Sequence, residues 1–140
     1  MTAAEKAIAE KPDIYQYHDY REYLESWIDW AKSFEKKFSV RKFSSSCGFS
    51  PSYISLVLSG QRHLSQKATE KLVETMKLDQ SEKSYFKWLH NLAESSSQAD
   101  RLKALQQILR FRDYKSLNPK EFEIFKYMTK WYYVALSLIH

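Results

Sequence analysis

The chain has 140 residues, of which 44% are hydrophobic and 16% aromatic, and its formal net charge is +5. This composition excludes a disordered chain, and the single cysteine excludes an internal disulfide framework. The longest apolar run, residues 131–139, contains Ser137 and is too short to cross a bilayer, and the first 13 residues lack the apolar core of a secretory signal. We therefore expect a folded cytoplasmic protein without a membrane span.

The positive charge is concentrated in one part of the chain. Residues 1–35 carry four basic and eight acidic side chains, whereas residues 36–78 carry eight basic and two acidic ones. The remainder carries ten basic and seven acidic side chains. A basic excess confined to one segment is what binding to phosphates requires, and a solvated basic face without a partner is the alternative.

The chain reads as helices throughout. After an N-terminal tail, residues 1–18, a first long helix begins at about Asp19, which forms a capping-box-like pair with Glu22. Its apolar side is broad enough to pack against more than one neighbour: it comprises Tyr23, Leu24, Trp27, Ile28, Trp30, Ala31 and Phe34.

The only two glycines of the chain, Gly48 and Gly60, bracket a short helix. A preceding helix, residues 40–47, ends at Gly48, because glycine commonly follows a last helical turn. We expect Ser50 to cap the next helix and Pro51 to occupy its first position, so that this helix spans 51–59. The inward residues of the two helices are Val40, Phe43, Cys47, Ile54, Val57 and Leu58, and we interpret Cys47 as a small core residue.

Two short helices joined by a glycine-containing turn are typical of a helix-turn-helix. The spacing resembles that of lambda-repressor and Cro-like regulators, with a small residue where the helices cross, glycine in the turn and branched residues in the second helix. The residues that carry this resemblance are Phe43, Ser44, Cys47, Gly48, Ile54 and Val57.

Two further helices complete the predicted domain. Ser65 caps residues 66–78, whose inward stripe is Ala68, Leu72, Val73 and Met76. Asp79 and Glu82 start a fifth helix, buried through Phe86, Leu89 and Ala93 with Tyr85, Trp88 and Leu92 alongside. The sequence thus predicts an all-α fold, with a five-helix Cro-like domain over residues 19–95 that ends before the polar segment SSSQAD.

Residues 96–140 are expected to form a helical arm. Leu102, Leu105 and Leu109 mark a sixth helix, and Asn118-Pro119 opens a seventh. The seventh is apolar on too many sides for a lone surface helix, which predicts a dimer or interdomain interface made of Phe122, Phe125, Met128, Trp131, Tyr132, Ala135, Leu136 and Ile139.

A second resemblance covers nearly the whole chain. The strings YQYHDYREYL, SGQRHLS and KWYYVALSLI, in this order, resemble a bacterial family with an N-terminal Cro-like domain and a C-terminal domain of unknown function. The resemblance implies that the chain is an N-terminal fragment, that it acts in transcription control, and that residues 96–140 lead into a missing C-terminal domain or pair with a second copy.

These patterns predict double-stranded DNA binding, with the helix at 51–59 in the major groove and the chain acting as a homodimer. The base-contact candidates are Ser50, Ser52, Tyr53, Ser55, Leu56 and Gln61. The phosphate-contact candidates are Lys36, Lys37, Arg41, Lys42, Arg62, His63 and Lys67.

One feature of the 51–59 helix differs from that of typical DNA-reading helices and favours an alternative function. The exposed face of the 51–59 helix has no Arg, Lys, Asn or Gln, the side chains that form paired hydrogen bonds with bases. A protein-interaction module that no longer reads DNA therefore remains open, with Tyr53, Leu56 and the serines contacting a protein partner. An enzyme is not expected, because the four histidines and Cys47 lack metal-ligand spacing and no glycine-rich phosphate loop or cofactor motif occurs.

Overall fold

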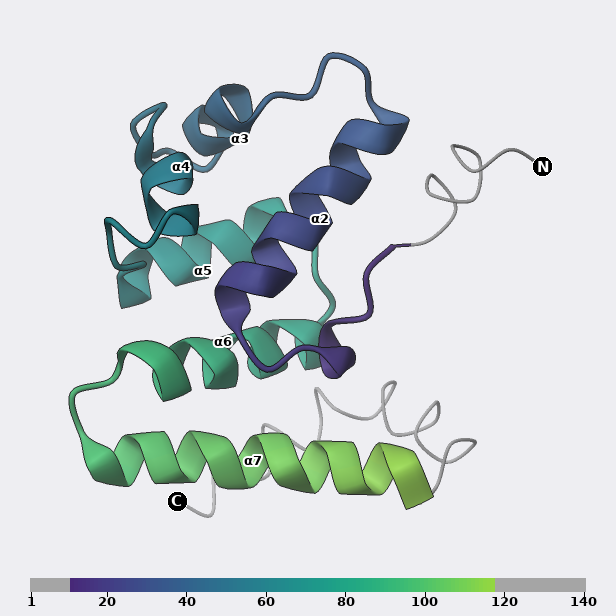
Figure 1. The fold of residues 1–140 in the computed structure, drawn as a ribbon, viewed down its shortest axis with the longest axis vertical. Helices are drawn as coiled ribbons and strands as arrows, with labels where there is room; N and C mark the ends of the chain where they lie inside the picture. Colours follow the sequence, from purple (N-terminus) through teal and green to yellow (C-terminus); the bar gives the residue numbers. More distant parts are fainter. Residues whose placement is uncertain (1–10, 118–140) are drawn as a thin grey trace. The chain divides into compact units, whose positions relative to one another are not determined.

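The computed structural model describes residues 11–117, and these residues are helical without any strand (Figure 1). This confirms the all-α prediction. The elements are the 3₁₀ turn η1 (Ile14–Gln16) and the helices α2 (Tyr20–Phe34), α3 (Val40–Ser46), α4 (Tyr53–Leu58), α5 (Gln66–Thr75), α6 (Gln80–Glu94) and α7 (Gln98–Leu117). The predicted helix that begins at Pro119 lies outside the described residues. Within residues 11–117, no helix combines the length and the apolarity that a membrane span requires.

The chain divides into two compact units, of which one ends at Lys77 and the other begins at Leu78. The sequence predicts a later boundary, in the polar segment 95–100, and so groups α6 with the preceding helices. In the structure α6 packs against α7, which is why it belongs to the second unit. Lys77, at the end of the first unit, has a φ of 57°, a left-handed conformation in which helices commonly end.

The first unit is built around α2. Asp19 caps this helix by accepting a hydrogen bond from the backbone N–H of Arg21. One broad side of α2 is buried, through Tyr20, Tyr23, Leu24, Trp27, Ile28 and Ala31. Phe34, predicted on the same side, is 53% exposed, so the buried face ends one turn earlier than the apolar pattern does.

Two segments pack around α2 through aromatic and aliphatic side chains. Ile14 and Tyr15 of η1 are buried, although the sequence places them in an N-terminal tail. The ring of Trp27 lies 5.1 Å from that of Phe43 on α3 and 6.3 Å from that of Phe38. These rings anchor the start of the α3–α4 region on α2, since aromatic side chains bury a large area each.

Helix α5 follows the sequence prediction closely. The Ser65 hydroxyl accepts a hydrogen bond from the N–H of Ala68 at 3.1 Å, so Ser65 is the predicted cap. The predicted inward stripe is buried in full, with Ala68, Leu72, Val73 and Met76 all less than a tenth exposed.

The second unit contains α6 and α7, which lie side by side (Figure 1). Asp79 and Glu82 form the predicted capping box at the start of α6. The rings of Tyr85 and Trp88 on α6 lie 6.1 Å and 5.6 Å from the ring of Phe111 on α7. Aromatic packing therefore joins the two helices.

One prediction of a buried residue in this unit is wrong, and the sixth helix, which three leucines predict, is present as α7. Phe86 and Leu89 are buried as predicted, but Ala93, on the same side one turn later, is exposed because it lies in the last turn of α6, beyond the buried part. The leucines that mark α7 are also exposed, Leu102 at 56%, Leu105 at 37% and Leu109 at 50%. Among residues 98–113, whose side chains the structure describes, the buried residues of α7 are Ala104, Ile108 and Phe111. At about 100° per residue the two stripes are about 130° apart on the helix, so α7 carries two apolar faces and spacing alone does not select the buried one.

Candidate functional site

Helices α3 and α4 are joined by a turn that Ser44 holds from inside. The Ser44 side chain is fully buried and its hydroxyl donates a hydrogen bond of 2.5 Å to the backbone carbonyl of Ser50. Gly48 has a φ of +85°, the left-handed backbone that glycine adopts without a steric cost. The N–H of Phe49 donates to the carbonyl of Ser44 at 3.0 Å. Ser44 and Gly48 thus fix how the chain enters α4. Gly48 follows the end of α3 as predicted, whereas the sequence does not indicate the bond from Ser44 to Ser50.

The start of α4 differs from the prediction. The helix begins at Tyr53, two residues later than Pro51, and no side-chain hydrogen bond caps it at Ser52. Ser50 contributes its carbonyl, which accepts from the Ser44 hydroxyl and from the N–H of Tyr53. The predicted capping role of Ser50 is wrong, because the bond to Ser44 holds this residue through its backbone. Ile54 and Val57 are buried as predicted.

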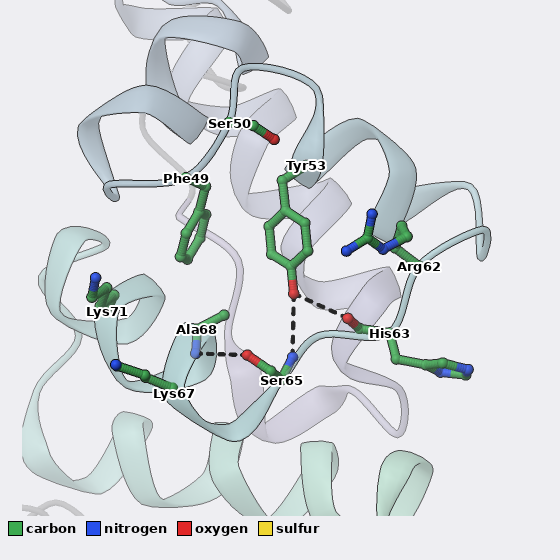
Figure 2. Close-up of a pocket in the computed structure, with 9 residues that line it drawn as sticks. All are labelled: Phe49, Ser50, Tyr53, Arg62, His63, Ser65, Lys67, Ala68 and Lys71. Atoms are coloured by element: carbon green, nitrogen blue, oxygen red, sulfur yellow. Dashed lines mark hydrogen bonds between the residues drawn. The ribbon is translucent and has the colours of Figure 1, made fainter.

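An open hollow of about 470 Å³ lies between the α3–α4 turn, the loop that follows α4 and the first turns of α5 (Figure 2). No aspartate or glutamate lines it. Three of its nine lining residues are permanent cations, Arg62, Lys67 and Lys71. The others are Phe49, Ser50, Tyr53, His63, Ser65 and Ala68. A concave surface with several cations and no carboxylate attracts an anion.

Tyr53 forms part of the wall of this hollow. Its ring packs edge to face against Phe49, with centroids 5.0 Å apart, and the guanidinium of Arg62 lies 5.7 Å from the Tyr53 ring. Its hydroxyl donates to the carbonyl of His63 at 3.0 Å and accepts from the N–H of Ser65 at 3.2 Å (Figure 2). The hydroxyl therefore bonds to two backbone groups of the protein itself. From the sequence, Tyr53 is a candidate for contact with a base.

Arg21 approaches the same loop from α2. Its Nε donates to the carbonyl of Val57 at 2.9 Å, and its Nη2 donates to the carbonyl of Arg62 at 3.4 Å. Val57 is in the last turn of α4, where carbonyl groups lack helical partners and a cation is favourable. The N–H of Gly60 also donates to the carbonyl of Val57, at 3.1 Å, so Arg21 is a further donor at the end of α4 and joins it to the loop beyond.

The predicted base-contact residues gather on one part of the first unit. Ser50, Ser52, Ser55 and Gln61 are exposed, and Tyr53 and Leu56 are half-buried. Ser50 and Tyr53 also line the hollow. All except Gln61 lie on α4 or in the turn that precedes it, and Gln61 lies in the loop that follows α4.

The predicted phosphate-contact residues are all exposed, but they form two groups. Arg62, His63 and Lys67 line the hollow, whereas Lys36 and Lys37 lie in the α2–α3 connection and Arg41 and Lys42 in the first turn of α3. The predicted interface residues Phe122, Phe125, Met128, Trp131, Tyr132, Ala135, Leu136 and Ile139 lie outside the described residues.

Sequence reasoning missed two residues of this region. Lys71 follows Lys67 by one helical turn, so their i, i+4 spacing on α5 could have indicated that both line one surface. Its Nζ lies 3.7 Å from where a Cβ on Gly48 would stand, which brings the ammonium group to the α3–α4 turn. Arg21 carries no comparable signal, because its acceptors lie 36 and 41 residues away in the sequence.

Cys47 lies in the core of the first unit, as the sequence predicts. Cys47 is buried, and burial raises the pKa of its thiol above the ordinary value despite hydrogen bonds with Thr75 and Ser46 that lower it. A thiol with a raised pKa is a weak nucleophile near neutral pH. Across residues 11–117, no group of three His, Cys, Asp or Glu side chains is placed to hold a metal ion.

The region therefore offers exposed serines and an amide on and after α4, beside a concave cluster of cations. This arrangement can hold a phosphate-bearing polymer through its phosphate groups and present polar side chains to the groups that the polymer carries between its phosphates. Comparisons with protein-family models, with curated proteins and with solved structures gave no match to this chain.

Proposed function

We propose that the protein binds double-stranded DNA as a bacterial cytoplasmic transcriptional regulator, using α3 and α4 as a lambda-repressor-like helix-turn-helix. The observation that carries the proposal is the hollow beside α4, in which Arg62, Lys67 and Lys71 gather without a carboxylate. Cations in this position neutralise backbone phosphates while α4 enters the major groove. The function proposed is binding, not catalysis.

The residues that would meet base edges are Ser52, Ser55 and Leu56, with Ser50 and Gln61 at the two ends of α4. Serine hydroxyls bond to any base and discriminate poorly, and Leu56 suits a thymine methyl group. One copy therefore has modest specificity. A homodimer supplies the rest by placing two reading helices about one DNA turn, roughly 34 Å, apart.

The test is a fluorescence-anisotropy titration with a pool of randomised duplexes at several salt concentrations, followed by sequencing of the retained DNA. We expect salt-sensitive binding and enrichment of a two-fold symmetric site. Replacing Lys67 and Lys71 with glutamine should reduce the salt slope by up to about two. The matched control replaces Arg101 and Lys103 on α7 with glutamine, which changes the net charge equally at exposed positions of the second unit. Equal slopes in the two variants would exclude the hollow as the phosphate site.

Dimer formation is tested separately. The proposal assigns pairing of copies to residues 119–140, so replacing Trp131 and Tyr132 with polar residues should shift a dimer toward monomer in analytical ultracentrifugation. An unchanged mass would contradict pairing through this segment and would favour its packing against a C-terminal domain.

A second candidate is a protein-interaction module on the same scaffold. It is favoured by the surface of α4 and its ends, where exposed Ser52, Ser55 and Ser59 and half-buried Leu56 lack paired donors. It is also favoured by the engagement of the Tyr53 hydroxyl within the protein. Absence of duplex binding even at low salt would favour this candidate over the DNA proposal.

A further inference from the structure

The backbone of the loop that follows α4, residues 59–65, is held by hydrogen bonds, and the buried side chain of Leu64 anchors the loop as well. The carbonyl of Leu56 accepts from the N–H groups of Gln61 and Arg62, at 3.0 Å and 3.2 Å. The carbonyls of Arg62 and His63 and the N–H of Ser65 are bound by side chains from elsewhere in the first unit. Within residues 59–65, backbone groups of six residues are therefore hydrogen-bonded: Ser59, Gly60, Gln61, Arg62, His63 and Ser65.

The two side chains that hold the loop come from different helices, α4 and α2, which both precede it in the sequence. Tyr53, in the first turn of α4, reaches over to His63 and Ser65. Arg21, on α2, bridges the end of α4 to the loop through the carbonyls of Val57 and Arg62. Both side chains are half-buried. They link two helices, α2 and α4, to one short segment.

The same segment presents exposed polar side chains, those of Gln61, Arg62 and His63. A loop that must be ordered when it binds loses conformational entropy at that step, and a loop that is already ordered does not. Hydrogen bonds that fix the backbone and leave the side chains exposed are suited to such a preformed binding surface.

We propose that Arg21 and Tyr53 are positioning residues that hold loop 59–65 in its DNA-binding conformation before DNA arrives. This inference rests on the proposed DNA binding. It assigns the Tyr53 hydroxyl to the loop instead of to a base edge, and it gives Arg21 a role in DNA affinity without a contact to DNA.

The test combines hydrogen exchange of the free protein with duplex titration. Tyr53→Phe removes both hydroxyl bonds and retains the ring between Phe49 and Arg62. Arg21→Met removes the other two bonds, and Arg21→Lys restores a single donor. Tyr17→Phe is the matched control, because it removes the hydroxyl of another half-buried tyrosine of the first unit, which packs against Tyr23 of α2. Thermal unfolding establishes whether each variant folds. If Arg21→Met does not fold, Tyr53→Phe and Arg21→Lys still test the inference.

We expect the loop amides of Gln61, Arg62 and Ser65 to exchange about tenfold faster in Tyr53→Phe and Arg21→Met, since each variant loses hydrogen bonds that restrain the loop. Duplex affinity should fall about tenfold, and the salt slope should decrease by about one as Arg62 loses its fixed position. Arg21→Lys should recover part of both effects, and Tyr17→Phe should show neither. A loss of packing alone would not reduce the salt slope.

Two results are decisive against the inference. Faster loop exchange with unchanged duplex affinity and slope would show that DNA binding does not need a prearranged loop, while the proposed function would stand. Absence of duplex binding by the unaltered protein at low salt would overturn the proposed function and the inference together.

Discussion

Replacing Gly48 with alanine should destabilise the protein by about 1 kcal/mol, for a reason confined to the backbone. Gly48 has a φ of +85°, where a side chain with a Cβ costs about 1 to 2 kcal/mol per residue. The loss of unfolded-state freedom from glycine to alanine returns about 0.4 to 1 kcal/mol. The nearest atom to the added Cβ is Lys71 Nζ at 3.7 Å, an ordinary contact with the end of a flexible side chain, so packing adds nothing.

Gly60 provides the matched control, because its φ is +81° and a Cβ there meets no atom within 4 Å. Gly60→Ala should therefore cost about the same as Gly48→Ala. Gly48→Asn should cost less than Gly48→Ala, because asparagine enters the left-handed region more readily than other residues. The measurement is urea unfolding monitored by far-ultraviolet circular dichroism, and variants are compared when the unfolding free energy has the same dependence on urea concentration.

Two outcomes would refute this reasoning. Full stability of Gly48→Ala would mean that the left-handed backbone of Gly48 carries no cost. A loss above about 3 kcal/mol at Gly48 but not at Gly60 would mean that packing around the α3–α4 turn excludes the methyl group.

Three further changes test other parts of the structure. Replacing Arg41 and Lys42 with alanine should lower the salt slope of duplex binding by up to about two in anisotropy titrations, and an unchanged slope would remove both from the phosphate contacts. Burial raises the folded-state pKa of Cys47, so the thiol of the unfolded chain ionises first as the pH rises above about 8.5, and stability present below that pH is lost above it. The unfolding midpoint of Cys47→Ala should lack this loss at high pH, and identical pH profiles of the two proteins would contradict the reasoning. On α7, Ile108→Ala should cost about 2 to 5 kcal/mol and Leu102→Gln less than about 0.5 kcal/mol in urea unfolding, and the reverse order would contradict the assignment of the buried face.

Features set by neighbouring residues could be predicted from the sequence. Ser65 caps α5 and Asp79 with Glu82 starts α6, because capping joins side chains to N–H groups two or three residues away. Gly48 in the α3–α4 turn follows the same logic, since its left-handed backbone is a local property.

Features that depend on distant residues could not be predicted in this way. In the sequence, Arg21 looks like any polar residue in the first turn of a helix. Its bond to Val57 depends on the packing of α2 and α4, which are 36 residues apart at this bond. α7 has apolar residues on two faces, and the position of α6 decides that Ile108 is buried and Leu105 is not. The start of α4 depends on the carbonyl of Ser50, which Ser44 holds from the preceding helix.

The contrast between the capped start of α6 and the uncapped start of α4 also bears on the order of folding. The capping box gives α6 a nucleus encoded in four consecutive residues, and the contacts of α6 with α7 are close in sequence. Contacts of short sequence separation form fast, so we expect this helical hairpin to appear early. α4 has six residues, no side-chain cap and a bond to an arginine 36 residues away. The helix proposed to read DNA should therefore be among the last to form, once α2 is in place.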